Sequence, residues 1–502
     1  MASIAESVVW LAPELILVVF ALLILAVDLV QKEKKDWPIY LSLVGLGSAL
    51  LATAGLWGAN QLLLFGTYTI DLFSTLLKLV AFLATALVTL SAFDYVAGGR
   101  GTMNPQSGSA ASGALAFRSL GAEFYSLLLF AALAMALMAS ATDLIMIYLA
   151  IEFLSIASYI LVGYLRDDPL SNEASIKYFL YGAIISAVML YGMSLLYGLT
   201  GSTNLADIAA YFANFPVGLI PARLLGLIIL VFLVAGFGFK ISVVPFHQWA
   251  PDAYEGAPTP VTAFISVGPK VAGFAILLRV FLTALPYFQV DWMALLAGIA
   301  AITMTLGNLV AIPQKNIKRM LAYSSIAQAG YILLGVVAAS SLGVASALFY
   351  LIIYTFTNLG AFVIVIIYSN WLGSDNIDDY AGFSERSPGL AMAMVLFLLS
   401  LAGIPPLAGF VGKFFLFAAV MERGFVWLVA LGVMNSIVSL YYYLNVIKAM
   451  YIKRPTTEEP VPSSWALNGA LFIGVVGVIL LGVYPMPVIQ WIQAAATTFL
   501  SI

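Results

Sequence analysis

Four charged residues stand inside long apolar stretches of the chain: Glu152, Lys240, Lys270 and Lys413. Charged side chains are costly at the centre of a membrane, and those that occur there usually serve transport. Hydrocarbon surroundings disfavour the ammonium form of a lysine, whereas a nearby carboxylate favours it, so such a lysine can exchange protons. We expect Glu152 and Lys240 to influence each other's proton affinity. Lys270 and Lys413 would then continue a hydrated polar path that conducts protons.

Other polar residues in apolar stretches leave two interpretations open. Lys78 and Arg279 stand near the ends of their stretches, where they could either serve transport or only extend their charges to the membrane surface. Lys177 is also near an end. His247, the single histidine, follows Pro245 and is either a proton relay or a hydrogen-bonding residue of a loop. Glu14 is interpreted as a charge that meets another subunit.

The composition explains why these charges are unusual. Of 502 residues, 63% are hydrophobic and only 9% are charged, which excludes a soluble enzyme and indicates a protein solvated by lipid. The net charge of -3 comes without a basic block, so nucleic acid is not an expected partner. The absence of cysteine excludes thiolate metal sites and iron–sulfur ligation within the chain, and no nucleotide-binding motif is present. We therefore expect no cofactor and no metal here.

The apolar runs predict an all-α polytopic membrane protein with about fourteen transmembrane helices. Their approximate bounds are 10–30, 38–58, 71–96, 119–140, 143–164, 175–199, 223–249, 257–286, 292–312, 318–338, 343–371, 388–421, 425–452 and 465–493. Pro245 interrupts the seventh run, and Pro405 and Pro406 interrupt the twelfth. Both spans are expected to be broken helices, which line cavities instead of facing lipid.

The distribution of basic residues predicts the orientation. Thirteen lysines and arginines fall in loops after odd-numbered spans, against two, Arg223 and Arg423, on the even side. Odd-side loops are therefore expected in the cytoplasm, with both termini on the non-cytoplasmic side of the cell membrane. A stretch from about 202 to 222 is interpreted as an interfacial helix. The Gly/Ser-rich loop over 97–117 receives no function.

Self-comparison reveals a repeat. Residues 149–163 match residues 321–335 with seven identities in fifteen, and AGFGFK ending at Lys240 matches AGFVGK ending at Lys413 at nearly the same offset. Each match joins spans of opposite parity, which predicts two inverted five-helix repeats. The predicted divisions are an N-terminal three-helix segment with the loop (1–118), a first repeat (119–286), a second repeat (287–453) and a last helix (454–502).

The stretch FKISVVPFHQWAPDAYEGAPTPVTAFISVGPK, from Phe239 to Lys270, closely resembles the antiporter-like membrane subunits of respiratory complex I. The DAYEGAPTP portion and a lysine at position 413, where subunit M carries glutamate, place the resemblance in the subunit N branch. It covers nearly the whole chain, whereas the loop over 97–117 departs from the family pattern.

The resemblance implies a proton-translocating module of NADH-quinone oxidoreductase. The family's functional positions fall on five residues of this chain, Glu152, Lys177, Lys240, Lys270 and Lys413. It implies neighbouring small membrane subunits and subunit M, with NADH, FMN, iron–sulfur clusters and quinone bound by other subunits. Two alternatives stay open. One is a subunit of a multisubunit sodium/proton antiporter, and the other is an assembly subunit whose buried charges only hold partners.

Overall fold

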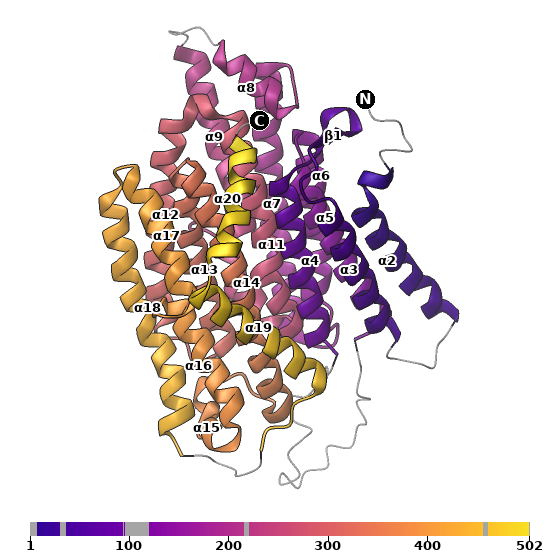
Figure 1. Ribbon diagram of the computed structural model, residues 1–502, viewed down its shortest axis with the longest axis vertical. Coiled ribbons are helices and arrows are strands. Elements are labelled where there is room, and N and C mark those ends of the chain that lie inside the picture. The colour runs from indigo at the N-terminus through magenta and orange to yellow at the C-terminus, as the bar shows by residue number, and fades with distance from the viewer. Residues whose placement is uncertain are drawn as a thin grey trace.

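The computed structural model describes residues 8–30, 37–93, 95, 120–214, 220–454 and 460–500. The predicted loop over 97–117 lies outside these residues. The described chain is a bundle of long helices, with α8 and β1 near one end and α15 at the other (Figure 1). By the predicted orientation, the α15 end is the cytoplasmic one.

The N-terminal section contains three spans and a small hairpin. Its helices are α2 (Ala12–Val30), α3 (Trp37–Gly55) and α4 (Leu72–Ser91). Between α3 and α4, β1 (Gln61–Leu63) and β2 (Tyr68–Ile70) pair antiparallel around the 3-10 turn η1 (Leu64–Gly66), a hairpin that hydropathy did not predict. Asp71 begins α4 with a reciprocal capping box to Ser74, which satisfies two free backbone donors.

The next five spans form the predicted first repeat. They are listed with their connecting elements as α5 (Ala122–Ser140), α6 (Leu144–Val162), α7 (Pro169–Thr200), α8 (Leu205–Ala213), α9 (Ile220–Ile241), α10 (Trp249–Gly256), α11 (Thr259–Arg279), η2 (Val280–Ala284) and η3 (Pro286–Phe288). Asp143 and Asp168 cap α6 and α7 through their side chains, and Pro169 follows at the first helical position. The short helix α8 lies within the stretch 202–222, and its expected place at the membrane surface stays a prediction.

The predicted second repeat follows the same order. Its elements are α12 (Gln289–Ala311), α13 (Ile317–Val337), α14 (Ser341–Leu372), η4 (Ile377–Tyr380), α15 (Phe383–Arg386), α16 (Pro388–Ala402), α17 (Ala408–Glu422) and α18 (Val426–Ile452). In both units the third span is a helix of 32 residues, α7 and α14, and the fourth is broken. This shared order supports the repeat, while the predicted divisions at 118, 286 and 453 remain predictions.

The two predicted breaks occur between α9 and α10 and between α16 and α17. Pro245 lies in the first, and Pro405 and Pro406 lie in the second. The carbonyl of Phe239, near the end of α9, accepts hydrogen bonds from the backbone amide of Ser242 and from the indole of Trp249, each at 3.1 Å. At the second break Gly403 ends α16 with φ +90°, a conformation that glycine adopts without a steric penalty. Thirteen described helices are long and apolar enough to span a membrane, and the halves α16 and α17 supply the fourteenth span.

The last predicted span, 465–493, is wrong as a single helix. The structure has α19 (Trp465–Val483) and α20 (Met486–Leu500), separated by Tyr484 and Pro485. Because the residues on both sides of Pro485 are apolar, hydropathy alone did not reveal this third break. In Figure 1, α20 (yellow) continues from α19 toward the end of the bundle that carries α8.

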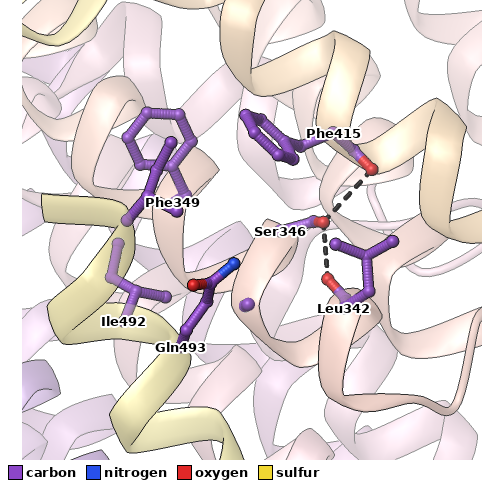
Figure 2. Close-up of a pocket in the computed structure, with 8 residues that line it drawn as sticks. Leu342, Ser346, Phe349, Phe415, Ile492 and Gln493 are labelled. Atoms are coloured by element: carbon purple, nitrogen blue, oxygen red, sulfur yellow. Dashed lines mark hydrogen bonds between the residues drawn. The ribbon is translucent and has the colours of Figure 1, made fainter. Parts of the chain in front are cut away.

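A narrow pocket lies where α20 meets α14 and α17. Figure 2 shows Ile492 and Gln493 of α20 opposite Phe349 of α14, with the Ser346 hydroxyl directed at two backbone carbonyls. Those hydrogen bonds go to Leu342 at 2.6 Å and Phe415 at 3.1 Å. The pocket holds about 10 Å³, room for one water molecule at most. It is therefore a packing defect of the bundle and no binding site.

The centre of the bundle is formed by α11, α13 and α14. Every residue of α11 is buried, including Lys270, and nearly all of α13 and α14 is buried as well. A helix that is apolar on all sides belongs in such a central position. Lys270 therefore occupies the innermost helix of the protein.

Candidate functional site

Lys240 lies in the last turn of α9, immediately before the first helix break. Its side chain is 2% exposed, and its ammonium group donates a 2.8 Å hydrogen bond to the hydroxyl of Ser155 on α6. The C-terminal end of a helix carries partial negative charge, which favours a cation there. Lys240 thus belongs to the last turn of α9, while its ammonium group reaches the serine hydroxyl of a neighbouring helix.

Glu152 lies one turn before Ser155 on α6 and accepts a short hydrogen bond from Ser186 of α7, which in turn approaches the Tyr148 hydroxyl. Among the described residues, Glu152 and Lys240 form no ion pair. They are nevertheless joined through one face of α6, because Ser155 contacts the lysine and stands three residues from the glutamate. A charge on one can therefore act on the other without direct contact.

Lys270 follows Pro269 in the middle of α11. Its ammonium group donates to the carbonyl and hydroxyl oxygens of Ser325 on α13. The hydroxyl of Tyr354 donates to the same Ser325 hydroxyl at 2.7 Å, and that of Tyr254 lies 3.1 Å from it. Serine and tyrosine hydroxyls both donate and accept hydrogen bonds, so this cluster can pass a proton.

Lys413 lies on α17, after the second break. Its ammonium group donates to the carbonyl of Ala402 at 3.0 Å and to the hydroxyl of Ser436 at 3.2 Å. It also lies 4.3 Å from the centre of the Tyr331 ring, a favourable position for a cation. Lys240 precedes its break and Lys413 follows its own, so the expected equivalence by sequence offset does not hold for the backbone. The ammonium groups also differ in their partners, since that of Lys413 binds the carbonyl at the C-terminal end of α16, whereas that of Lys240 binds Ser155 of a neighbouring helix.

One face of α13 connects Lys270 to Lys413. Ser325, Gln328 and Tyr331 are spaced three residues apart and therefore share a face. Ser325 contacts Lys270, and Tyr331 lies beside Lys413. Between them, the Gln328 side chain accepts a 2.6 Å hydrogen bond from Tyr350 and donates a 3.0 Å bond to the carbonyl of Leu401. Sequence reasoning anticipated bridging polar residues but did not identify these three.

Two other deeply buried cations, Lys78 and Arg279, differ because each has a carboxylate partner. Lys78 on α4 is 2.8 Å from Glu14 on α2, and the Tyr68 hydroxyl contacts both. Arg279 is 2.8 Å from Asp71. Interpreting Lys78 and Arg279 as charges that extend to the membrane surface is therefore wrong, and Glu14 is buried within the chain instead of being free to meet a subunit. Among the described residues, Lys240, Lys270 and Lys413 have no ion-pair partner.

Lys177 lies away from this buried series, in an ion-pair network at the α15 end. Half of its side chain is exposed, and it contacts Glu173 at 2.6 Å and Asp252 of α10 at 2.8 Å. Arg319 of α13 also pairs with Asp252, at 2.8 Å. Partial burial raises the pKa of Asp252, but the hydrogen bonds from Lys177 and Arg319 outweigh it and hold that pKa below its usual range. The network fastens α10 to α7 and α13.

His247 lies half-buried in the connection between α9 and α10, two residues after Pro245. Among the described residues, no hydrogen bond joins it to Glu152 or to the buried lysines. Its relay role stays a prediction. In the described part of the chain, no group of three or more His, Asp or Glu residues is arranged to hold a metal ion.

Comparisons with known proteins place this geometry in a family. The profile described as "NADH:quinone oxidoreductase/Mrp antiporter, TM" matches residues 141–439, more than half of the chain. NADH-quinone oxidoreductase subunit N of Heliobacterium modesticaldum is 43% identical over 97% of this chain and 98% of its own length. The chain belongs to the subunit N family. The resemblance inferred from the residues between Phe239 and Lys270 is thereby confirmed.

Solved structures agree with the fold. A chain of respiratory complex I from Thermus thermophilus with bound aureothin is 32% identical, with a TM-score of 0.78 over 96% of this chain and 100% of that one. A chain of the Mrp complex from Dietzia sp. DQ12-45-1b has a TM-score of 0.81 over 97% of each chain at 21% identity. At that identity the second likeness shows a shared fold alone, so the fold does not separate subunit N from the antiporter alternative, whereas sequence identity does.

Proposed function

We propose that this chain translocates protons across the membrane as an antiporter-like subunit of NADH-quinone oxidoreductase (complex I). The observation that carries the proposal is the contrast among buried cations. Lys78 and Arg279 are paired with carboxylates, whereas Lys240, Lys270 and Lys413 are buried without one. An unpaired ammonium group away from water is costly, so a fold that retains three of them has a use for their exchangeable protons.

The proposed proton path passes through the buried charged and polar residues described above. A change of charge near Glu152 acts on Lys240 across α6, and Lys240 exchanges its proton with Lys270 on the neighbouring helix α11. From Lys270 the proton moves along α13 past Ser325, Gln328 and Tyr331, with water molecules completing the connections, and reaches Lys413. The carbonyl end of α16 stabilises the protonated form of Lys413.

Two further predicted residues, Lys177 and His247, are proposed to act at the start of this path, near Lys240. Lys177 is proposed to act from the α15 end, where its ion pair with Asp252 holds α10, the helix that follows the break after Lys240. His247 is proposed as a relay in the connection opened by Pro245. Because α10 begins directly after that connection, movement of the ion-pair network would change how water reaches Lys240.

The proposal extends to the surroundings of the chain. Its neighbours would be subunit M and the small membrane subunits, within the bilayer of the cell membrane, with both termini on the non-cytoplasmic side. Electrons would pass from NADH to quinone in other subunits, which would hold the FMN and iron–sulfur clusters. This chain would transfer no electrons itself.

The test is proton pumping by the whole complex in liposomes, with NADH oxidation measured in the same sample. We expect Lys240→Ala, Lys270→Ala and Lys413→Ala each to lower the protons moved per NADH oxidised, while the complex still assembles. Arg166→Ala, which changes an exposed cation away from the path, is the control and should leave this ratio unchanged.

Two outcomes would reject the proposal. If the lysine variants lose assembled complex in proportion to their loss of pumping, the chain is an assembly subunit. If the chain instead purifies without NADH-oxidising partners and exchanges sodium for protons, it is an antiporter subunit.

A further inference from the structure

A cleft of about 210 Å³ opens at the α15 end of the bundle, away from the buried lysines. It lies between the loop that joins α12 to α13, the turn η4 and the C-terminal end of α18. Lysines line it from two sides, with Lys315 in the loop and Lys448 and Lys453 at the end of α18. The amide side chains of Gln314 and Asn445 lie between them. A cleft lined in this way attracts an anion.

Two of the three lysines, Lys315 and Lys448, are free to bind an anion. Lys453 is 2.6 Å from Asp378, which neutralises it. Lys315 and Lys448 are exposed and, among the described residues, have neither an ion-pair nor a hydrogen-bond partner for their ammonium groups. The cleft therefore presents two unbalanced positive charges together with amide donors, which is the chemistry that binds phosphate groups.

The surface beside the cleft indicates what carries the phosphate. Lys448 lies one turn before the end of α18. Toward the start of this helix, Leu444, Tyr441 and Ile437 occur at successive intervals of four, three and four residues, so they share a helix face with Lys448. All three are exposed, by 44%, 58% and 67%. At 1.5 Å per residue the stripe from 437 to 448 is about 16 Å long. That is half the hydrocarbon thickness of a bilayer, the depth of one leaflet.

The neighbouring helix continues this surface. Helix α12 packs against α18, and its residues Leu309 and Ile302 are also exposed, at 53% and 56%. Leu309 precedes the cleft residue Gln314 by five positions. Both helices thus present an apolar face that leads up to the lysines.

We propose that the cleft binds the phosphate headgroup of an anionic phospholipid, with an acyl chain lying along the exposed face of α18. A free phosphate would use only the lysines and would leave the apolar stripe without a function. A lipid uses both the charges and the leaflet-length stripe. Each lysine near an anionic headgroup contributes about 1 kcal/mol, which corresponds to a roughly fivefold change in affinity.

The experiment uses the complete complex in nanodiscs that contain phosphatidylglycerol and phosphatidylcholine, with retained lipids counted by native mass spectrometry. We expect Lys315→Gln and Lys448→Gln each to weaken phosphatidylglycerol binding roughly fivefold and the double variant roughly 25-fold. Arg166→Gln, which removes an exposed cation from another loop at the same end, is the matched control and should change binding less than twofold. Equal retention of phosphatidylglycerol in the double variant and the wild type would overturn the proposal.

Two further arms separate the sources of the ligand. Inorganic phosphate added to delipidated complex should bind far more weakly than phosphatidylglycerol, and equal affinity would assign the cleft to free phosphate. A photoreactive benzoylphenylalanine in place of Tyr441 should yield adducts with the mass of a phospholipid. Adducts with another subunit would show that protein covers this face, and would likewise overturn the lipid proposal.

Discussion

Lys270 donates to both the carbonyl and the hydroxyl oxygen of Ser325, so a single residue of α13 holds this ammonium group from two sides. Two tyrosine hydroxyls reach the same serine. The central lysine of the bundle is thus held by neutral groups. With neutral partners, Lys270 can gain or lose a proton without an ion pair being broken, which a carboxylate partner would require.

Replacing Ser325 tests this relationship. Ser325→Ala removes the hydroxyl but leaves the carbonyl, so we expect Lys270 to remain in place and proton pumping to slow roughly tenfold, the effect of losing one hydrogen bond to a charged group. The measurement is the initial pumping rate in liposomes under NADH. Ser346→Ala is the control, because its hydroxyl bonds to backbone carbonyls at the pocket in Figure 2, off the path. Equal rates in both variants would remove Ser325 from the path.

The buried pair of Lys78 and Glu14 should be structural. Lys78→Met leaves the Glu14 carboxylate buried without its cation, and we expect it to cost about 3–5 kcal/mol of stability. The double variant Lys78→Met, Glu14→Gln should cost less than the single one, because no unpaired charge remains. Thermal melting of the purified complex compares the two variants, and the single variant should melt at the lower temperature. Protons moved per NADH should be unchanged in the complex that survives, and a selective loss of pumping would place the pair in the proton path.

The network around Asp252 predicts a specific pH dependence. Its folded-state pKa is lowered, so its stabilising contribution is fully present above its unfolded pKa, near 3.9, and is lost as the pH falls through the folded value. We expect hydrogen exchange of residues 249–256, corrected for its intrinsic pH dependence, to stay constant between about pH 5 and 9.

Asp252→Asn should reproduce the acid state at neutral pH by removing the Asp252 ion pairs with Lys177 and Arg319, although Arg319 keeps its pair with Glu255. Protection of residues 249–256 should then fall severalfold. Glu173→Gln removes only an exposed pair with Lys177 and should change protection little, as exposed ion pairs contribute about 0–1 kcal/mol. If α10 exchanges equally in both variants, the network does not fasten it.

The second helix break depends on a close backbone approach. A Cβ atom at Gly409 would lie 1.7 Å from the carbonyl oxygen of Ser400, so Gly409→Ala must push α16 and α17 apart. We expect loss of pumping with little assembled complex. Gly389→Ala is the matched control on α16, because nothing lies within 4 Å of its added Cβ, and alanine in a helix is favoured over glycine by about 0.5–1 kcal/mol. Normal activity of Gly409→Ala would show that the break tolerates separation.

Hydropathy and proline placement predicted most of the fold. Pro245 and Pro405 mark real breaks because proline removes a helical hydrogen bond and glycine or polar residues nearby permit the turn. The same reasoning missed the break at Pro485, which stands in a run where every flanking residue is apolar. It also missed the hairpin between α3 and α4, because its strands have only three residues each.

The residues with unusual chemistry were visible in the sequence, but their partners were not. Lys240 and Lys270 could be singled out because a charge in an apolar run is conspicuous. Whether such a charge is paired depends on how two helices are rotated against each other, and a single sequence does not reveal that rotation. Lys78 therefore looked like a lysine near a membrane surface, although Glu14 lies 64 positions earlier in the chain and 2.8 Å away in space.

The length of the two half-helices α16 and α17 has a consequence for biosynthesis. Each has 15 residues, so each is about 22 Å long, too short to cross a hydrocarbon core of about 30 Å. Neither half can be stably inserted into the bilayer by itself, because neither is long enough to span it. The two halves are therefore expected to enter the membrane together as one unit, and their packing against α18 and α19 can form only after those later helices have been made.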